Sequence, residues 1–216
     1  MKIPKIKNII DLSLELSPDS VVWPGDNHLS FDRRVRMADG ALCNSSTILM
    51  SLHTATHADA PIHYAKGGKS MESVQLSRFC GPAKVYTVPS KGNFITRADL
   101  EKLEIGKNDL LLFKTANGEM LLDHSFHTQF VCFDLSAAKY LVEKGVRGVG
   151  VDYLSIEKYN TEDGLVHNTL LSHEIGVLEG LNLSQVKDGE YFLAALPLKI
   201  RGSDGSPVRA VLIEFE

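Results

Sequence analysis

Residues 53–63 read HTATHADAPIH and place three histidines and one aspartate within eleven residues. The four positions, His53, His57, Asp59 and His63, are all odd-numbered. Side chains of an extended strand alternate between its two faces, so these four would share one face as far as the strand persists. A helix fits worse, because at about 100° per residue Asp59 would lie roughly 240° from His53, and Pro61 would break it. The spacing therefore predicts an extended segment with four polar groups on one face.

Two imidazoles and a carboxylate that converge on one point form a metal site of nitrogen and oxygen ligands. Zinc or manganese suits such a set, and three protein ligands leave positions open for water. The carboxylate of Asp59 can also bridge two metal ions, one on each oxygen, in which case a second ligand set must come from elsewhere. The competing interpretation is a polar strand whose histidines bind no shared ligand and lie together by chance.

A second candidate segment spans residues 167–179. Glu179 lies inside the apolar run 175–181, and charged residues are almost never fully buried without a partner. A buried Glu179 would therefore need a cation. On spacing alone, a glutamate on the outward face of a half-buried strand is an equally good explanation.

The rest of the chain predicts a mixed α/β fold in a single domain, residues 1–216. Alternation and β-branched residues predict strands over residues 9–14, 47–60, 83–88, 109–115 and 146–151. Helices are expected over residues 97–103 and 136–144, the second capped by Ser136 and ended by Gly145. A C-terminal hairpin is expected from residues 192–200 and 208–215, with a turn at 202–205.

Composition excludes several classes of protein. Of the 216 residues, 44% are hydrophobic and 23% charged, as in ordinary globular proteins. No apolar stretch approaches the ~20 residues that cross a bilayer. The net charge of −4 argues against a nucleic-acid partner, and the basic run 33–36 is interpreted as a solvated face. Three scattered cysteines form no disulfide framework, and Asp11 and Glu15 interrupt any leader peptide, so a cytoplasmic protein is expected.

Several ordered blocks resemble one known family. The pattern His53-x-x-x-His57-x-Asp59-Ala-Pro-x-His63 is similar to the HxGxHxDAPxH signature of the cyclase-like metal-dependent hydrolases, whose best-known member is bacterial kynurenine formamidase. Residues 23–26 (WPGD) are similar to a block near the family's N-terminus, and residues 177–180 (VLEG), with a histidine twelve residues before Glu179, resemble its second metal-ligand pair. Residues 195–198 and 206–211 resemble its closing strands.

The resemblance implies a swivelling β/β/α fold, a homodimer and two divalent metal ions, Zn²⁺ or Mn²⁺, per subunit. By this resemblance one ion is held by His53, His57 and Asp59, and the other by Asp59, His167 and Glu179. His63 would be the catalytic acid/base, and Trp23 would line the substrate pocket.

The implied reaction is hydrolysis of N-formyl-L-kynurenine to L-kynurenine and formate by a metal-activated water. A His63 acid/base with an ordinary pKa near ~6.5 could take the water proton and return it to the departing amine. Relatives of this family hydrolyse other amides and lactams such as isatin, so a different small substrate is the first alternative. A non-catalytic metal-binding or ligand-binding protein is the second, and the intact His63 argues against it.

One residue departs from the family pattern. The family usually has glycine where this chain has Ala55. A methyl group is accommodated there if φ is negative, and is strained if the position needs a positive φ. The departure bears on the fit of the substrate more than on metal binding.

Overall fold

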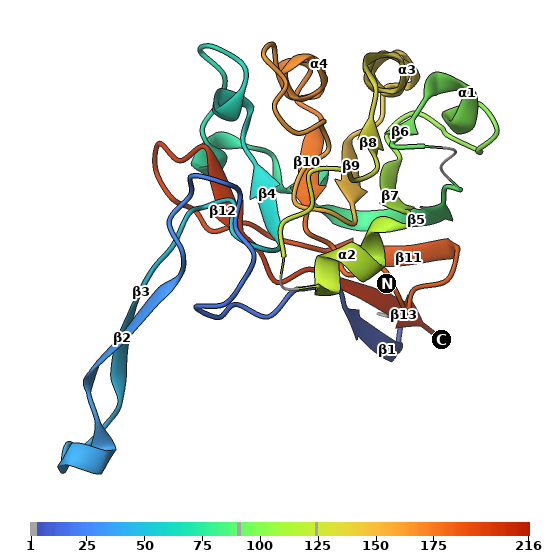
Figure 1. Cartoon of the computed structure of the whole chain (residues 1–216). Helices are drawn as coiled ribbons and strands as arrows, with labels where there is room; N and C mark the ends of the chain where they lie inside the picture. The colour runs from blue at the N-terminus through green and yellow to red at the C-terminus, as the bar shows by residue number, and fades with distance from the viewer. Residues whose placement is uncertain (1–3, 90–91, 124) are drawn as a thin grey trace.

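A mixed β-sheet with helices along one face forms the body of the molecule (Figure 1). The computed structural model describes residues 4–89, 92–123 and 125–216. Within these residues the sheet has nine strands in the order β1-β13-β11-β5-β7-β9-β10-β4-β12. The strands are β1 (Ile6–Asp11), β4 (His57–Asp59), β5 (Cys80–Thr87), β7 (Leu110–Lys114), β9 (Gly148–Val151), β10 (Gly176–Glu179), β11 (Gly189–Ala194), β12 (Gly205–Pro207) and β13 (Val211–Phe215).

The centre of this sheet is parallel and its two sides are antiparallel. Strands β5, β7, β9 and β10 run parallel, while β4 and β12 on one side and β11, β13 and β1 on the other run antiparallel to their neighbours. Both faces of the central strands are buried, as the continuous apolar run of β7 requires. Leu111 and Phe113 pack into the core under the helices, and Leu110 and Leu112 into the core on the other face.

Three helices cover one face of the sheet in a row, α1 (Arg97–Leu100), α3 (Leu135–Lys144) and α4 (Leu165–Ser172), as Figure 1 shows. Helix α3 ends at Gly145 in the left-handed conformation, as predicted, with φ 67°. The predicted cap Ser136 is wrong, because the Asp134 side chain accepts the hydrogen bond from Ala137 N instead. The remaining elements are α2 (Asn117–Leu122), the parallel pair β6 (Phe94–Ile95) and β8 (Cys132–Phe133), and the 3₁₀ turns η1 (Met37–Asp39), η2 (Pro61–His63), η3 (Met71–Ser73) and η4 (Leu76–Arg78).

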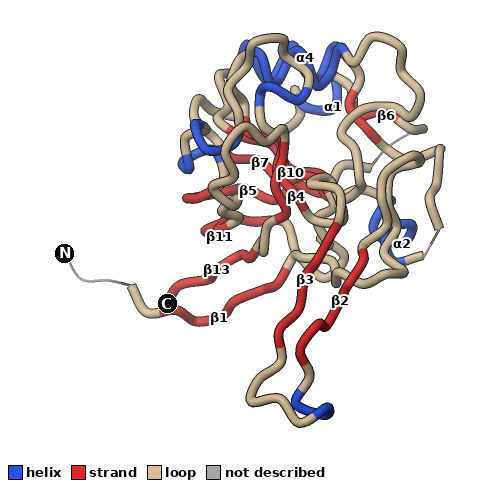
Figure 2. The backbone as a smooth tube through the Cα atoms, turned by 90° about the vertical axis from the view of Figure 1, so that its left-hand side faces the viewer, coloured by secondary structure: helices blue, strands red, loops and turns tan. Residues whose placement is uncertain are grey.

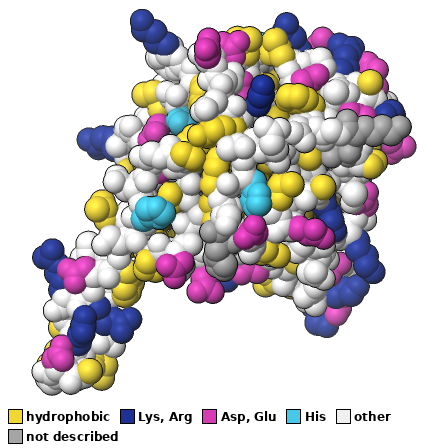
Figure 3. Space-filling view, in the orientation of Figure 1, with side chains coloured by type: hydrophobic (Ala, Val, Ile, Leu, Met, Phe, Trp, Pro, Cys, Tyr) yellow, Lys and Arg dark blue, Asp and Glu magenta, His cyan; other side chains and the backbone are white. Residues whose placement is uncertain are grey.

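A two-stranded antiparallel hairpin projects away from this body. We call it the arm: β2 (Ser30–Val35), β3 (Ser45–Leu49) and the connection between them, residues 36–44. Figures 1 and 2 both show it extending beyond the sheet, and every residue of its two strands is exposed. In Figure 3 the arm carries basic, acidic and apolar side chains. The exposed apolar residues are Phe31, Val35, Met37, Leu42, Ile48 and Leu49.

The predicted α/β class is confirmed, and two predicted elements are corrected. The extended segment expected over residues 47–60 is interrupted by turns between β3 and β4. The expected C-terminal hairpin is wrong in its connection. Strands β11 and β13 do pair, with Phe192 opposite Ile213, but the chain between them crosses the sheet to place β12 beside β4. In the described part of the chain no helix is long and apolar enough to span a membrane.

Candidate metal centre and active site

The candidate site is built where β4 and β10 pair as antiparallel neighbours. Glu179, the last residue of β10, lies directly opposite His57, the first residue of β4. Asp59 is two residues further along β4, so its side chain shares the face of His57. All three residues are buried. The sequence prediction that His57 and Asp59 point to one side of a strand agrees with this geometry.

His53 and His63 join this group by a different route from the one predicted. His53 lies in the turn before β4, and His63 ends the 3₁₀ turn η2 that Pro61 begins. Strand alternation therefore aligns only His57 and Asp59. The other two imidazoles converge because the chain bends at both ends of a three-residue strand, and their rings stack with centroids 4.1 Å apart.

Asp59 lies between two sets of donor atoms. Its Oδ1 is 3.0 Å from His53 Nδ1 and 3.5 Å from His57 Nε2. Its Oδ2 faces the other way, 3.8 Å from Nε2 of His167 on α4. Glu179 closes the second set, with Oε1 3.2 Å from His167 Nε2. In each set, one of His53, His57 and Asp59 and the other of Asp59, His167 and Glu179, the donor atoms lie within 4.8 Å of one another.

In each histidine of these sets, the ring nitrogen that faces away from the other donor atoms has a hydrogen-bond acceptor. His57 Nδ1 donates to Ala55 O at 2.9 Å, and His167 Nδ1 donates to Glu157 Oε2 at 2.7 Å. His53 Nε2 is 3.1 Å from Asp204 Oδ2, an oxygen that can only accept. An outer acceptor fixes the tautomer and turns the inner nitrogen toward a metal ion, as in the carboxylate–histidine–metal arrangement.

The donor set fits a pair of divalent cations. His57 Nε2 and Asp59 Oδ2 are buried without a hydrogen-bond partner, although Glu179 Oε2 lies 3.0 Å from the former in a poor geometry. Buried polar atoms are almost always paired, so these two orphaned atoms point to a ligand. Three imidazole nitrogens and two carboxylates are donors that zinc and manganese accept.

The electrostatics of the cluster also favour cations. Burial lowers the pKa of His53 and of His167, but their carboxylate neighbours outweigh it and raise these pKa values to about 9 and about 10. Burial raises the pKa of Asp59, yet the adjacent histidines hold it well below its usual range. The pocket thus stabilises positive charge against buried carboxylates, and a divalent cation would take the place of the protons on His53 and His167.

A cavity of about 130 Å³ opens onto both sets and is lined by His63 and Trp23 as well. Burial lowers the pKa of His63, which keeps this imidazole neutral and able to accept a proton near neutral pH. The indole of Trp23 packs edge-on against Phe126, with centroids 5.1 Å apart, and next to Tyr159. The predicted catalytic and substrate-binding residues therefore lie on the same cavity as the predicted ligands. Their roles stay predictions.

Three residues of the site carried no signal in the sequence analysis. Glu157 is buried behind His167, Tyr64 stacks on the His167 ring at 4.2 Å, and Asp204 lies beside His53. Tyr64 directly follows the histidine motif, and this position is the signal that could have identified it. Asp204 was placed in a hairpin turn, and only the pairing of β12 with β4 brings it to the site.

Comparison with known proteins agrees with this geometry. A family model described as putative cyclase matches residues 10–158. Kynurenine formamidase of Bacillus thuringiensis (strain Al Hakam) is 35% identical over 209 residues, covering 96% of this chain and 98% of that protein. Kynurenine formamidase of Salinibacter ruber (strain DSM 13855 / M31) is 36% identical over 205 residues, covering 94% of this chain and 96% of that protein.

The fold is also known from solved structures. One described as a potential metal-dependent hydrolase with cyclase activity is 34% identical and covers 97% of this chain and 98% of that one, with a TM-score of 0.84. The chain belongs to the cyclase family. The family resemblance predicted from the sequence is confirmed.

Proposed function

We propose that this chain is a metal-dependent amide hydrolase that converts N-formyl-L-kynurenine and water into L-kynurenine and formate. The observation that carries the proposal is the pair of donor sets that share Asp59, beside the imidazole of His63 in one cavity. Relatives named kynurenine formamidase, about a third identical over nearly the whole chain, support this substrate. We take residues 1–216 as one functional domain, because the site collects residues from 53 to 204.

The metal ligands we propose are those of the two donor sets, with Asp59 bridging. His53 and His57 complete one set, and His167 and Glu179 complete the other. When bound, divalent ions such as Zn²⁺ or Mn²⁺ supply Lewis acidity and lower the pKa of water from about 16 toward about 7. The adjacent histidines hold the pKa values of Asp59 and Glu179 below their usual range, so both carboxylates are available as anionic ligands.

His63 is the proposed acid and base. Its Nδ1 faces Asp204 at 3.7 Å, which leaves Nε2 as the nitrogen that exchanges protons with the reactants. Nε2 takes a proton from the attacking water as the water oxygen bonds to the formyl carbon. It returns that proton to the aryl amine nitrogen as the C–N bond breaks. The products are the free amine of kynurenine and formic acid, which releases its remaining proton to solvent as formate, so atoms and charge balance.

Trp23 is proposed to contact the aromatic ring of the substrate. The indole lies on the wall of the cavity that holds the ligands, and its neighbours Phe126 and Tyr159 keep it in place. Stacking on a planar ring suits an aryl amide. We expect Trp23→Phe to raise KM with little change in kcat, and an unchanged KM would mean that Trp23 only packs the core.

The decisive assay is hydrolysis of N-formyl-L-kynurenine by the purified protein, followed as kynurenine absorbance. We expect turnover that a chelator abolishes and that added zinc or manganese restores. A folded, metal-loaded protein without turnover would contradict the proposed substrate. A panel of other aryl amides and lactams, isatin included, would then identify the reaction.

Two variants separate metal binding from proton transfer. His63→Ala is expected to retain both metal ions and to lose most turnover, since general acid–base catalysis contributes roughly 10²- to 10⁴-fold. Asp59→Ala is expected to lose metal and turnover together, because it removes the shared ligand. Metal analysis beside kinetics measures both effects, and full activity of His63→Ala would contradict the assigned role.

We also propose a homodimer assembled through the arm, and a cytoplasmic location. An isolated two-stranded hairpin is marginally stable in water, so the apolar side chains that the arm exposes, with Leu42 at 99%, call for a covering partner. A second copy of this chain supplies this covering partner.

The cytoplasmic location is supported by the cysteines. The three cysteines are free thiols, as in proteins of reducing compartments.

A further inference from the structure

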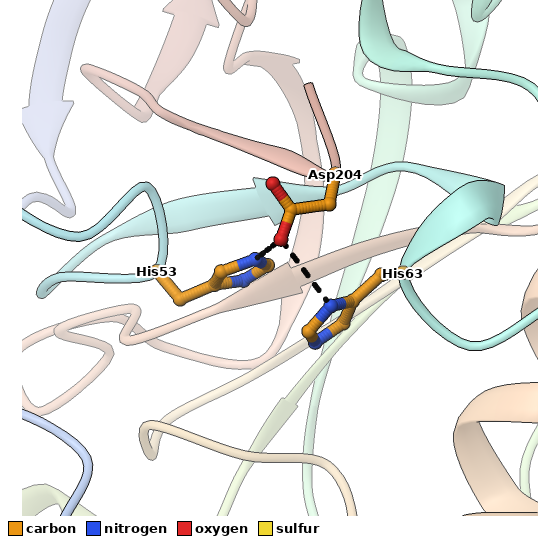
Figure 4. A group of neighbouring side chains, drawn as sticks. All are labelled: His53, His63 and Asp204. Atoms are coloured by element: carbon orange, nitrogen blue, oxygen red, sulfur yellow. Dashed lines mark hydrogen bonds and ion pairs between the residues drawn. The ribbon is translucent and has the colours of Figure 1, made fainter. Parts of the chain in front are cut away.

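A single carboxylate oxygen, Oδ2 of Asp204, faces one ring nitrogen of each of the two stacked imidazoles, His53 and His63 (Figure 4). Asp204 Oδ2 is 3.1 Å from His53 Nε2 and 3.7 Å from His63 Nδ1. One of these rings belongs to the proposed ligand set and the other to the proposed acid and base. A carboxylate can only accept hydrogen bonds, so both nitrogens that face it must carry hydrogen when they donate to it.

The backbone around Asp204 is fixed onto the histidine segment. Ala60 N donates to Asp204 O at 2.8 Å, and Gly205 pairs with Asp59 in the β12–β4 register. A Cβ atom at Gly205 would lie 2.6 Å from His53 Cε1, so the absence of a side chain there makes room for the imidazole. Strand pairing thus fixes the backbone from which the half-exposed carboxylate of Asp204 reaches the two rings.

We propose that Asp204 is a positioning residue that holds His53 and His63 together through this one oxygen. By accepting from His53 Nε2, it fixes the tautomer whose Nδ1 lone pair points toward Asp59 and the metal. By facing His63 Nδ1, it fixes the tautomer whose Nε2 is free to take the water proton. The 3.7 Å gap closes by a small rotation of the carboxylate, as apo contacts of this kind often do when substrate is bound.

The inference rests on the proposed function, and it goes beyond it by coupling one metal ligand to the proton-transfer residue. Asp204 remains a carboxylate throughout. The proton removed from water resides on His63 Nε2 until the amine leaves. Loss of Asp204 is therefore expected to weaken metal binding and proton transfer by two separate routes, one through each histidine.

The test uses Asp204→Asn, Asp204→Glu and, as a matched control, Asp123→Asn, which removes the charge from an exposed aspartate paired with His127. Zinc affinity is measured by chelator competition. The constants kcat and KM are measured at saturating zinc. We expect Asp204→Asn to bind zinc about 10- to 100-fold more weakly and to lose at least about tenfold in kcat with KM nearly unchanged. Asp204→Glu should recover part of both losses, and Asp123→Asn should show neither.

The same substitution made in a His63→Ala protein separates the effect through His53 from the effect through His63. In a His63→Ala chain, Asp204→Asn should still weaken zinc binding but should lower kcat no further. Unchanged zinc affinity, or a kcat loss that persists undiminished without His63, would overturn the proposal. The zinc measurement needs no substrate, so a failure to hydrolyse N-formyl-L-kynurenine would count against the proposed function and not against Asp204.

Discussion

Ala55 adopts the left-handed conformation with φ 57°, between the two histidines His53 and His57. Its carbonyl accepts from His57 Nδ1, and a Cβ at Gly180 would lie 2.2 Å from the same oxygen, so the turn is packed closely against Gly180. The strain expected for a methyl group at a positive φ is therefore present. A non-glycine residue in this region costs about 1–2 kcal/mol.

We expect Ala55→Gly to raise the free energy of unfolding by about 1 kcal/mol, since glycine's greater freedom in the unfolded chain offsets only part of the relief. Denaturant unfolding of the two proteins measures the difference. Asn108→Gly is the control: its φ is 63°, but asparagine tolerates this region, so the gain should be smaller. A glycine variant no more stable than the parent would show that Ala55 is not strained.

Glu157 offers a second prediction at this scale. Its Oε2 accepts from His167 Nδ1, and its Oε1 accepts from Val166 N at 2.9 Å. In Glu157→Gln the amide NH₂ would face one of these donors. We expect zinc affinity to fall about 10- to 100-fold and the free energy of unfolding by about 1–3 kcal/mol. Glu101→Gln, at an exposed pair with Arg97, should leave both quantities unchanged, and the same result for Glu157→Gln would refute the prediction.

The sequence predicted which residues lie close together better than it predicted how the chain brings them together. Strand alternation correctly placed His57 and Asp59 on one face, because β4 extends across both. It could not place His53 and His63, whose positions depend on the bends at the two ends of that strand. Glu157 and Asp204 have no local signature at all, since their imidazole partners lie 10 and 151 residues away.

The arm is the element whose exposed apolar residues are hardest to reconcile with a monomer in water. Phe31 and Ile48 lie opposite each other in its ladder, and both are exposed. Exposed apolar side chains on a hairpin with no third strand predict burial against another molecule. The basic run 33–36, interpreted from the sequence as a solvated face, lies on the arm and is exposed along its whole length.

We expect the double variant Phe31→Ser/Ile48→Ser to weaken dimer formation at least about tenfold, because each serine removes roughly 1.5–3 kcal/mol of apolar burial from an interface. Sedimentation equilibrium of the two proteins measures it. Leu76→Ser changes an equally exposed leucine outside the arm and should have no effect. A monomeric parent, or a double variant that dimerises as well as the parent, would contradict the prediction.

Element types were predicted more reliably than connections. The apolar run of β7 and the Val-Gly alternation of β9 identify buried strands, and at Gly150 a Cβ would lie 2.6 Å from Leu112 Cδ2. The error over residues 195–210 has a simple cause. A glycine-rich turn between two strands indicates a hairpin, and nothing local shows that its second half pairs with β4 on the far side of the sheet.

At the scale of the whole molecule, the site lies where several elements from distant parts of the sequence meet. Strands β4 and β10, helix α4, two turns and Asp204, which directly precedes β12, each contribute a group, and these groups come from residues 53 to 204. The sheet changes from parallel to antiparallel between β10 and β4, which is where the donors converge. A cation held there would add a direct link between segments that are far apart in the sequence, so metal binding should stabilise the native fold as a whole.

Removing metal from the purified protein is therefore expected to lower its melting temperature. A ligand present at 100 to 1,000 times its Kd stabilises the native state by about 2.7–4.1 kcal/mol. For a chain of this length about 1 kcal/mol shifts the midpoint by roughly 2–4 °C, so chelation should lower it by roughly 5–15 °C. Calorimetry with chelator and with added zinc measures the shift. Asp59→Ala, which lacks the shared ligand, should melt at one temperature in both conditions. An equal midpoint for the parent protein with chelator and with zinc would mean that the cluster holds no cation tightly enough to stabilise the fold.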